Sequence, residues 1–285
     1  MKLRYSLLIL ASLQLFVSCQ EVITVDLPDL TPKLIVDALI RIDTTQSFTL
    51  AEIKLTETSD FFGTIHPVSV DQITMSDLDN PGNNTDQVLD ETSPGSGIYQ
   101  QLFSTERLVN DRWFLQIDFR GEIYVAEAQF DYGVPIDELT IGEGNLFSED
   151  QTELLIRYTD VGDREDYYLF DFDFGELFAS EDAFYDGQTF EFSYFYDRVF
   201  MPQDTINVSL MGIDRDLFNY VNLLRDQSQG GFGPFATPAV SVRGNLINAT
   251  SINNDDTLNN VNDPDNYALG YFSIVQEFKK SIVIE

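Results

Sequence analysis

Side chains that serve as nucleophiles or proton carriers are scarce in this sequence of 285 residues, which has one histidine, His66, and one cysteine, Cys19. A Ser-His-Asp triad would have to use His66, which precedes Pro67 in an expected loop. The sequence has no HExxH zinc motif, no glycine-rich phosphate loop and no GxSxG nucleophile elbow. One cysteine and one histidine also leave no basis for a cysteine-rich zinc cluster or a disulfide framework. We therefore expect a protein that is not an enzyme and has no catalytic residues.

Carboxylates are the one reactive group in excess, with 48 aspartates and glutamates. A pair of carboxylates can hydrolyse a glycosidic bond, so a surface hydrolase acting on glycans or peptides is an alternative function. With so many acids in the chain, no single pair stands out as catalytic. The presence of such pairs therefore does not favour hydrolysis.

Two acidic segments offer the oxygen ligands that Ca²⁺ prefers. The candidate ligands are Asp77, Asp79 and Asp86 in the first segment, and Asp255 and Asp256 in the second. Neither segment has the fixed glycine and final glutamate of an EF-hand loop. Asp and Asn also form turns in solvated loops, and that interpretation stays open beside the Ca²⁺ sites. We expect no cofactor, with Ca²⁺ as the one candidate.

Aromatic side chains offer a third kind of site. Phe232, Phe235 and Tyr271 are candidates for the lining of a partner groove, and packing in the core is the competing interpretation. Sugar-binding platforms favour Trp and Tyr, so the single tryptophan, Trp113, argues against a dedicated carbohydrate module.

Charge excludes two classes of partner. Lys and Arg number 16 against 48 acids, so the formal net charge is −32. Nucleic-acid backbones require basic patches, and an anionic lipid surface repels an acidic protein. We therefore expect no nucleic-acid partner, and contact with a membrane only through a lipid anchor.

The N-terminus predicts such an anchor. Residues 1–18 have a short basic start and an apolar stretch too short to span a membrane comfortably, as in a secretory signal peptide. The sequence Leu-Phe-Val-Ser-Cys that ends at Cys19 resembles a bacterial lipobox, in which the cysteine is lipidated and becomes the mature N-terminus. We expect residues 19–32 to be the lipidated cysteine and its tether, with the anchor firmly in a membrane.

The body is predicted to be mainly β. Residues 33–131 read as an antiparallel sandwich, immunoglobulin-like or prealbumin-like, because many short strands alternate with turns. The clearest hairpin lies between residues 112 and 130, where Trp113, Leu115, Ile117 and Phe119 share one face. Residues 132–285 form a second β-rich domain with one or two helices.

One helix is expected near residues 214–226. Asp214 is its predicted N-cap, and Leu217, Val221 and Leu224 form its predicted apolar stripe. Two glycines follow it at positions 230 and 231.

Several short motifs stand in a fixed order along the chain. They are the lipobox ending at Cys19, followed by residues 32–38, 97–99, 113–126 and 166–168, the helix at Asp214, residues 233–235 with Pro238, residues 244–246 and residues 269–273. This ordered set resembles a family of Bacteroidota lipoproteins, the domain of unknown function numbered 4249. Three-residue Asp-Thr motifs, such as the one at Asp204, resemble O-glycosylation sites of the same bacteria and agree with an envelope location.

The resemblance implies an outer-membrane lipoprotein, exposed at the cell surface or facing the periplasm. It implies an accessory or ligand-binding component of a TonB-dependent nutrient-uptake system, with a TonB-dependent transporter as partner and no established enzyme activity. A structural or adhesive envelope lipoprotein is a further alternative.

Overall fold

Strands account for most of the chain that can be described. The computed structural model describes residues 31–59, 63–80, 82, 86–144, 151–228, 241–250, 252 and 266–284. Residues 32–285 belong to one compact unit. In the described ranges, neither helix has the length and apolar character needed to cross a membrane.

The described residues of the first half of the body form ten strands and a short helix. These are β1 (Leu34–Ile42), β2 (Phe48–Glu57), β3 (His66–Pro67), β4 (Gln72–Asp77), β5 (Gln87–Val88), β6 (Asp90–Glu91), β7 (Ile98–Ser104), α2 (Thr105–Asn110), β8 (Trp113–Phe119), β9 (Glu122–Ala128) and β10 (Phe130–Asp131). The second half contains β11 (Ile136–Ile141), β12 (Thr152–Thr159), β13 (Tyr167–Asp171), β14 (Leu177–Glu181), β15 (Thr189–Tyr196), β16 (Thr205–Ile213), α3 (Arg215–Ser228), β17 (Ile247–Asn248) and β18 (Leu269–Val283).

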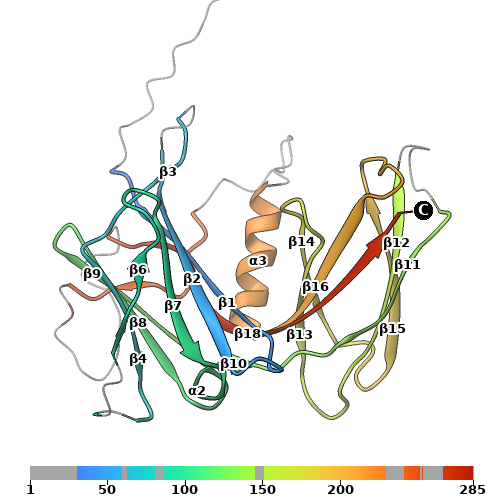
Figure 1. Ribbon diagram of the computed structural model, residues 1–285, viewed down its shortest axis with the longest axis horizontal. Coiled ribbons are helices and arrows are strands. Elements are labelled where there is room, and N and C mark those ends of the chain that lie inside the picture. Colours follow the sequence, from blue (N-terminus) through green and yellow to red (C-terminus); the bar gives the residue numbers. More distant parts are fainter. Residues whose placement is uncertain are drawn as a thin grey trace, which may run out of the picture. The chain divides into compact units, whose positions relative to one another are not determined.

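One large sheet runs through both halves, in the order β14-β13-β16-β18-β1-β2-β7-β6. Two smaller sheets, β17-β9-β8-β4-β5 and β11-β12-β15, contribute to separate cores with different parts of the large sheet. The first core contains Trp113, which is fully buried, and the second contains stacked and edge-on aromatic rings such as Phe172 and Tyr194. The architecture is therefore that of β-sandwiches joined by a shared sheet (Figure 1).

The long strand β18 connects the two cores. From Leu269 to Gln276 it pairs in parallel with β1, and from Glu277 to Val283 it pairs antiparallel with β16. Its residues Phe272 and Ile274 belong to the first core, although they stand near the end of the chain. The predicted domain boundary between residues 131 and 132 remains a prediction. Strand β18 contributes side chains to the cores of both halves.

The local predictions for the hairpin and the helix are confirmed. Trp113, Leu115, Ile117 and Phe119 are buried on one face of β8, which pairs with β9. In α3, the backbone N–H of Leu217 donates to Asp214 Oδ1 at 2.6 Å, which is the predicted N-cap.

The predicted stripe of α3 is wrong at its C-terminal end. Leu217 is buried and Val221 is partly buried, but Leu224 is 42% exposed. The apolar contacts of the helix come from its first turns, against a third apolar cluster that includes Tyr167, Leu169 and Val275. In its last turn, the guanidinium of Arg225 lies over the ring of Phe178 on β14. Helix α2 and the parallel pairing of β1 with β18 were not expected.

Candidate functional site

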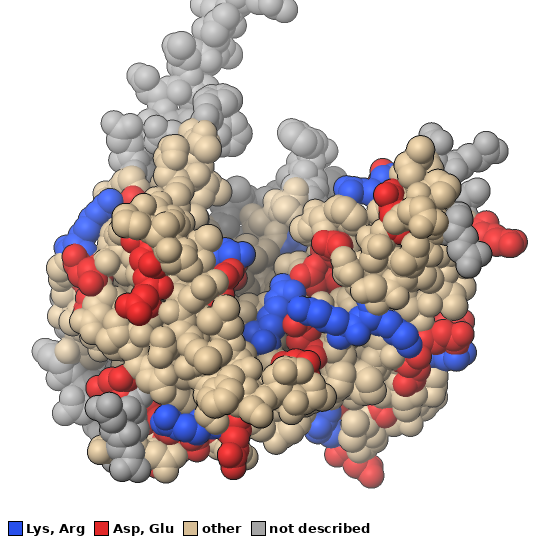
Figure 2. Space-filling view, in the orientation of Figure 1, with Lys and Arg blue, Asp and Glu red and all other residues tan. Residues whose placement is uncertain are grey.

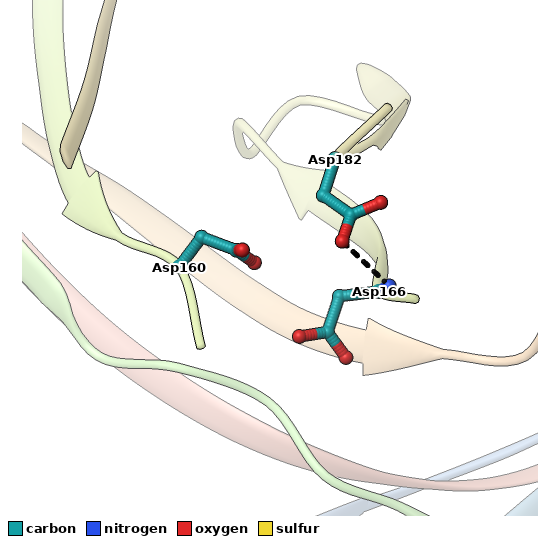
Figure 3. A group of neighbouring side chains, drawn as sticks. All are labelled: Asp160, Asp166 and Asp182. Carbon is teal, nitrogen blue, oxygen red and sulfur yellow. Dashed lines mark hydrogen bonds between the residues drawn. The ribbon is translucent and has the colours of Figure 1, made fainter. Parts of the chain in front are cut away.

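Three buried aspartates meet where strands of the second half end. Asp160 follows β12, Asp166 precedes β13, and Asp182 follows β14. Each is at most 6% exposed. One carboxylate oxygen from each lies within 4.8 Å of those of the other two. In Figure 3, the carboxylate of Asp160 points toward the other two aspartates, and that of Asp182 points toward the backbone nitrogen of Asp166.

Hydrogen bonds hold this carboxylate cluster in place. The hydroxyl group of Tyr168 donates to Asp160 Oδ1 and, at 3.3 Å, to Asp166 Oδ2. The N–H of Gly187 donates to Asp160 Oδ2 at 2.7 Å. The N–H of Asp166 donates to Asp182 Oδ2 at 3.0 Å, the bond drawn in Figure 3. The cluster therefore ties the connection between β12 and β13 to the end of β14.

Among the described residues, Arg164 is the one cation that pairs with the cluster. Arg164 Nε donates to Asp166 Oδ1 at 2.6 Å. Burial raises the pKa of Asp166 above its ordinary value, and the charges of Asp160 and Asp182 add to this effect, while Arg164 opposes it. Burial likewise raises the pKa of Asp182. Three carboxylates against one guanidinium leave an excess of negative charge in a poorly solvated place.

Two kinds of chemistry fit this arrangement. The carboxylates can share protons with one another and with Tyr168, or each can offer one oxygen to a hard cation such as Ca²⁺. In the described part of the chain, every buried side-chain nitrogen and oxygen atom already has a hydrogen-bond partner. Hydrogen bonding within the chain is thus sufficient to satisfy the cluster, and we assign it a structural role.

A hollow of about 250 Å³ lies next to the cluster and shares Asp166 with it. Its other lining residues come from β10, the connection from β12 into β13, and the junction of β16 with α3. They include Asp131, Arg164, Tyr167, Asp214 and Arg215. Arg215 is bonded to Glu165 and, at 2.6 Å, to the hydroxyl oxygen of Tyr167. The hollow is therefore polar and carries charges of both signs.

Arginine side chains bind two of the predicted Ca²⁺ ligands of the first segment. Asp77 is buried and accepts a hydrogen bond from Arg107 Nη2 at 2.7 Å. Burial alone would raise the pKa of Asp77. Its hydrogen bonds with Arg107 and Asn80 outweigh burial and lower the pKa to about 2. Asp79 pairs with Arg112 at 2.8 Å, and Asp86 is exposed. Turn formation and ion pairing thus explain Asp77 and Asp79, and Ca²⁺ binding there remains a prediction.

The other predicted site residues are scattered. Asp255, Asp256, Phe232, Phe235 and Cys19 lie outside the described residues. Tyr271 lies on β18 and packs against Tyr220 of α3, with ring centroids 5.3 Å apart. His66 is exposed in β3. The partner groove therefore remains a prediction, with Tyr271 placed beneath the helix.

The cluster of Asp160, Asp166 and Asp182 was not found from the sequence. In a chain with 48 acids, three aspartates at strand ends carry no distinguishing pattern. The only local signal is that Asp160 and Asp166 flank a short connection between two aromatic-rich strands.

Comparison with known proteins places the chain in a family. No curated protein matches it. Residues 20–281 match a family profile that covers nearly the whole chain. The chain belongs to the family described as domain of unknown function (DUF4249).

Proposed function

We propose that this protein is a lipid-anchored, non-enzymatic accessory component of a TonB-dependent nutrient-uptake system, and that it binds the transporter at the outer membrane. The observation that carries the proposal is the position of Cys19, at the end of a signal-like segment and shortly before the compact body begins at residue 32. An extended chain from residue 19 to residue 31 reaches at most about 45 Å. The anchor thus keeps the body near the membrane, within reach of a membrane protein.

The outer face of the large sheet supports a protein-binding role. Phe48 and Leu50 on β2 and Leu102 on β7 are 61%, 54% and 54% exposed, and Leu50 is the direct cross-strand partner of Leu102. We call these three residues the apolar strip. It lies on the face opposite the first core, where each side chain would otherwise be expected to be polar.

A polar hollow borders the apolar strip. It has a volume of about 390 Å³ and is lined by Asp37, Leu39, Arg41, Leu50, Glu52 and Lys54. An apolar centre with a charged rim is the usual composition of a protein–protein interface. On the face drawn in Figure 2, acidic side chains are widely spread and basic ones form a band near the middle, so charges of both signs are available to a partner.

A pull-down from native membranes tests this proposal. The tagged full-length protein is purified from detergent-solubilised membranes, and co-purifying proteins are identified by mass spectrometry. We expect a TonB-dependent transporter at close to one copy per copy of this protein. The variant Leu50→Glu with Leu102→Glu should lose the transporter, because two charges would be buried without partners.

The matched control is Leu177→Glu, which changes an exposed leucine of β14 elsewhere on the body. It should retain the transporter. Recovery of the protein alone, under conditions that preserve a known transporter complex, would contradict the proposal. In that case, turnover of glycans or peptides by the purified protein would test the hydrolase alternative.

A further inference from the structure

Asp131 occupies a junction of three elements. It ends β10, where its parallel partner is Val275 of β18, and it lines the 250 Å³ hollow together with Asp214, the N-cap of α3. It is half-buried there. A carboxylate in this position is poorly solvated and lies close to a second carboxylate.

Neither aspartate has a basic partner. No Lys or Arg of the described ranges forms an ion pair with Asp131 or Asp214 within 4.0 Å. The two arginines of the hollow are engaged elsewhere, Arg164 with Asp166 and Arg215 with Glu165. Neutral groups are the donors here: the N–H of Leu217 donates to Asp214 Oδ1 at 2.6 Å, and the hydroxyl group of Tyr271 lies 3.4 Å from the same oxygen.

The remaining charged or titratable groups do not supply the missing counter-charge. They include Glu277 and Lys279 on β18, Arg41 on β1, Tyr167 on β13, Asp216 and Tyr220 on α3, and Glu106 and Arg107 on α2. Arg41 shares the strand partner Val275 with Asp131, but it pairs with Asp171 and Glu277. Lys279 pairs with Glu277, and Arg107 pairs with Asp77. The surroundings of Asp131 therefore favour its neutral form.

The pKa values agree with this geometry. Burial, followed by the charge of Asp214, raises the pKa of Asp131 to about 7. A hydrogen bond from the backbone N–H of Asp214 favours the anion of Asp131, but it is outweighed. Burial also raises the pKa of Asp214. Because the pKa of Asp131 is higher in the folded protein than in water, its contribution to stability is present at low pH and is lost as the pH rises through about 7.

Helix α3 is the element that can move most easily when Asp131 becomes charged. Leu217 is its only buried residue, and Leu223 and Leu224 are 52% and 42% exposed. By contrast, β16 and β18 are paired on both sides over much of their lengths. Local opening occurs first where buried apolar contacts are fewest. Repulsion between Asp131 and the N-cap is therefore relieved most readily by movement of α3.

We propose that Asp131 and Asp214 form a pH-sensitive latch that holds α3 against the large sheet in mildly acidic medium and loosens it in mildly alkaline medium. Loosening uncovers the third apolar cluster, with Tyr167, Leu169 and Val275. The protein then presents an additional apolar surface as the pH rises.

Hydrogen–deuterium exchange of the full-length chain in detergent tests the latch. After correction for intrinsic exchange rates, the amides of α3 should exchange about 30-fold faster at pH 8.5 than at pH 5.5, because the stabilising contribution of Asp131 falls about tenfold per pH unit between pH 5.5 and about 7. The amides of β16 serve as the internal reference and should change much less. In the variant Asp131→Asn, the exchange rate of the α3 amides should no longer depend on pH. In the control variant Asp226→Asn, at the other end of α3, that dependence should persist.

A second variant keeps the proposal testable if Asp131→Asn fails to fold. Asp214→Asn keeps a good N-cap and removes one negative charge, so the transition of α3 should move to lower pH. The latch is overturned if α3 exchange is independent of pH in the wild type. It is also overturned if amide exchange in β16 changes with pH as much as exchange in α3, or if α3 exchange in Asp131→Asn depends on pH as strongly as in the wild type.

Discussion

The side chain of Asn245 pairs with the backbone of Phe272 as a neighbouring strand would. Asn245 Nδ2 donates to the carbonyl oxygen of Phe272 at 2.8 Å, and the N–H of Phe272 donates to Asn245 Oδ1 at 2.9 Å. Phe272 is fully buried in the first core. This contact gives a physical reason for two of the motifs at residues 244–246 and 269–273, since it joins them directly.

Replacing Asn245 should therefore destabilise the fold. Asn245→Ala leaves a donor and an acceptor of β18 without partners, and we expect a loss of about 2 kcal/mol in the free energy of unfolding. Urea unfolding followed by tryptophan fluorescence measures it. Asn207→Ala is the control, because the bonds of Asn207 are solvent-exposed and should contribute little. Equal losses in both variants would contradict this role for Asn245.

Gly270 meets two requirements at one position. Its φ is +102°, a conformation that L side chains rarely adopt, and an added Cβ would overlap the carbonyl oxygen of Val36 on β1. Gly270→Ala should therefore cost about 3 kcal/mol or more, because the parallel pair β1–β18 would have to separate.

Gly121 offers a matched control, since its φ is +80° and no atom lies within 4 Å of an added Cβ. Gly121→Ala should cost only about 1 kcal/mol, the conformational part alone. Thermal unfolding of both variants separates crowding from backbone strain. Similar costs at the two positions would show that crowding against Val36 is unimportant.

Sequence patterns were most informative where neighbours along the chain decide the structure. The alternation from Trp113 to Phe119 predicted the face of β8, and Asp214 predicted the start of α3. The parallel pair β1–β18 joins residues more than 200 positions apart, and alternation within a strand does not identify its partner. For the same reason, the helical pattern predicts a buried Leu224, whereas the side chain is 42% exposed.

The carboxylate cluster depends on tertiary structure in the same way. Asp160, Asp166 and Asp182 meet because three strand ends meet, and each alone resembles the other acids of the chain. Acidic turns that were visible in the sequence, at Asp77 and Asp79, are held by arginines whose positions depend on the fold. Site prediction was therefore weaker than prediction of the fold.

The hydroxyl group of Tyr168 should be important for the stability of the second half. Tyr168→Phe removes the donor to Asp160 and Asp166 and leaves both buried carboxylates with fewer bonds, so we expect a loss of about 1–3 kcal/mol. Chemical denaturation measures the loss. Tyr132→Phe, at a tyrosine that is 56% exposed, should have little effect. A Tyr168→Phe protein as stable as the wild type would exclude this role.

The cluster should also give the protein a distinctive dependence on pH. Burial raises the pKa values of Asp166 and Asp182, so their contribution to stability is greatest below the ordinary aspartate pKa of about 3.9 and is lost as the pH rises through the raised values. Asp182→Asn keeps an acceptor for the N–H of Asp166 but does not titrate. We expect its stability, measured by urea unfolding from pH 4 to pH 8, to fall less with rising pH than that of the wild type. Parallel curves would contradict the assignment.

Removal of Cys19 tests the anchor separately from the fold. Cys19→Ala removes the predicted site of acylation, and the acidic body has no charge attraction to an anionic membrane, so the protein should move from the membrane to the soluble fraction. Because the compact unit begins at residue 32, its circular dichroism and unfolding midpoint should match those of the wild type. Cell fractionation with a salt wash, followed by immunoblotting, measures the distribution. If Cys19→Ala stayed in washed membranes, an anchor other than the lipid would have to hold it, and the proposed role beside a transporter would rest on protein contacts alone.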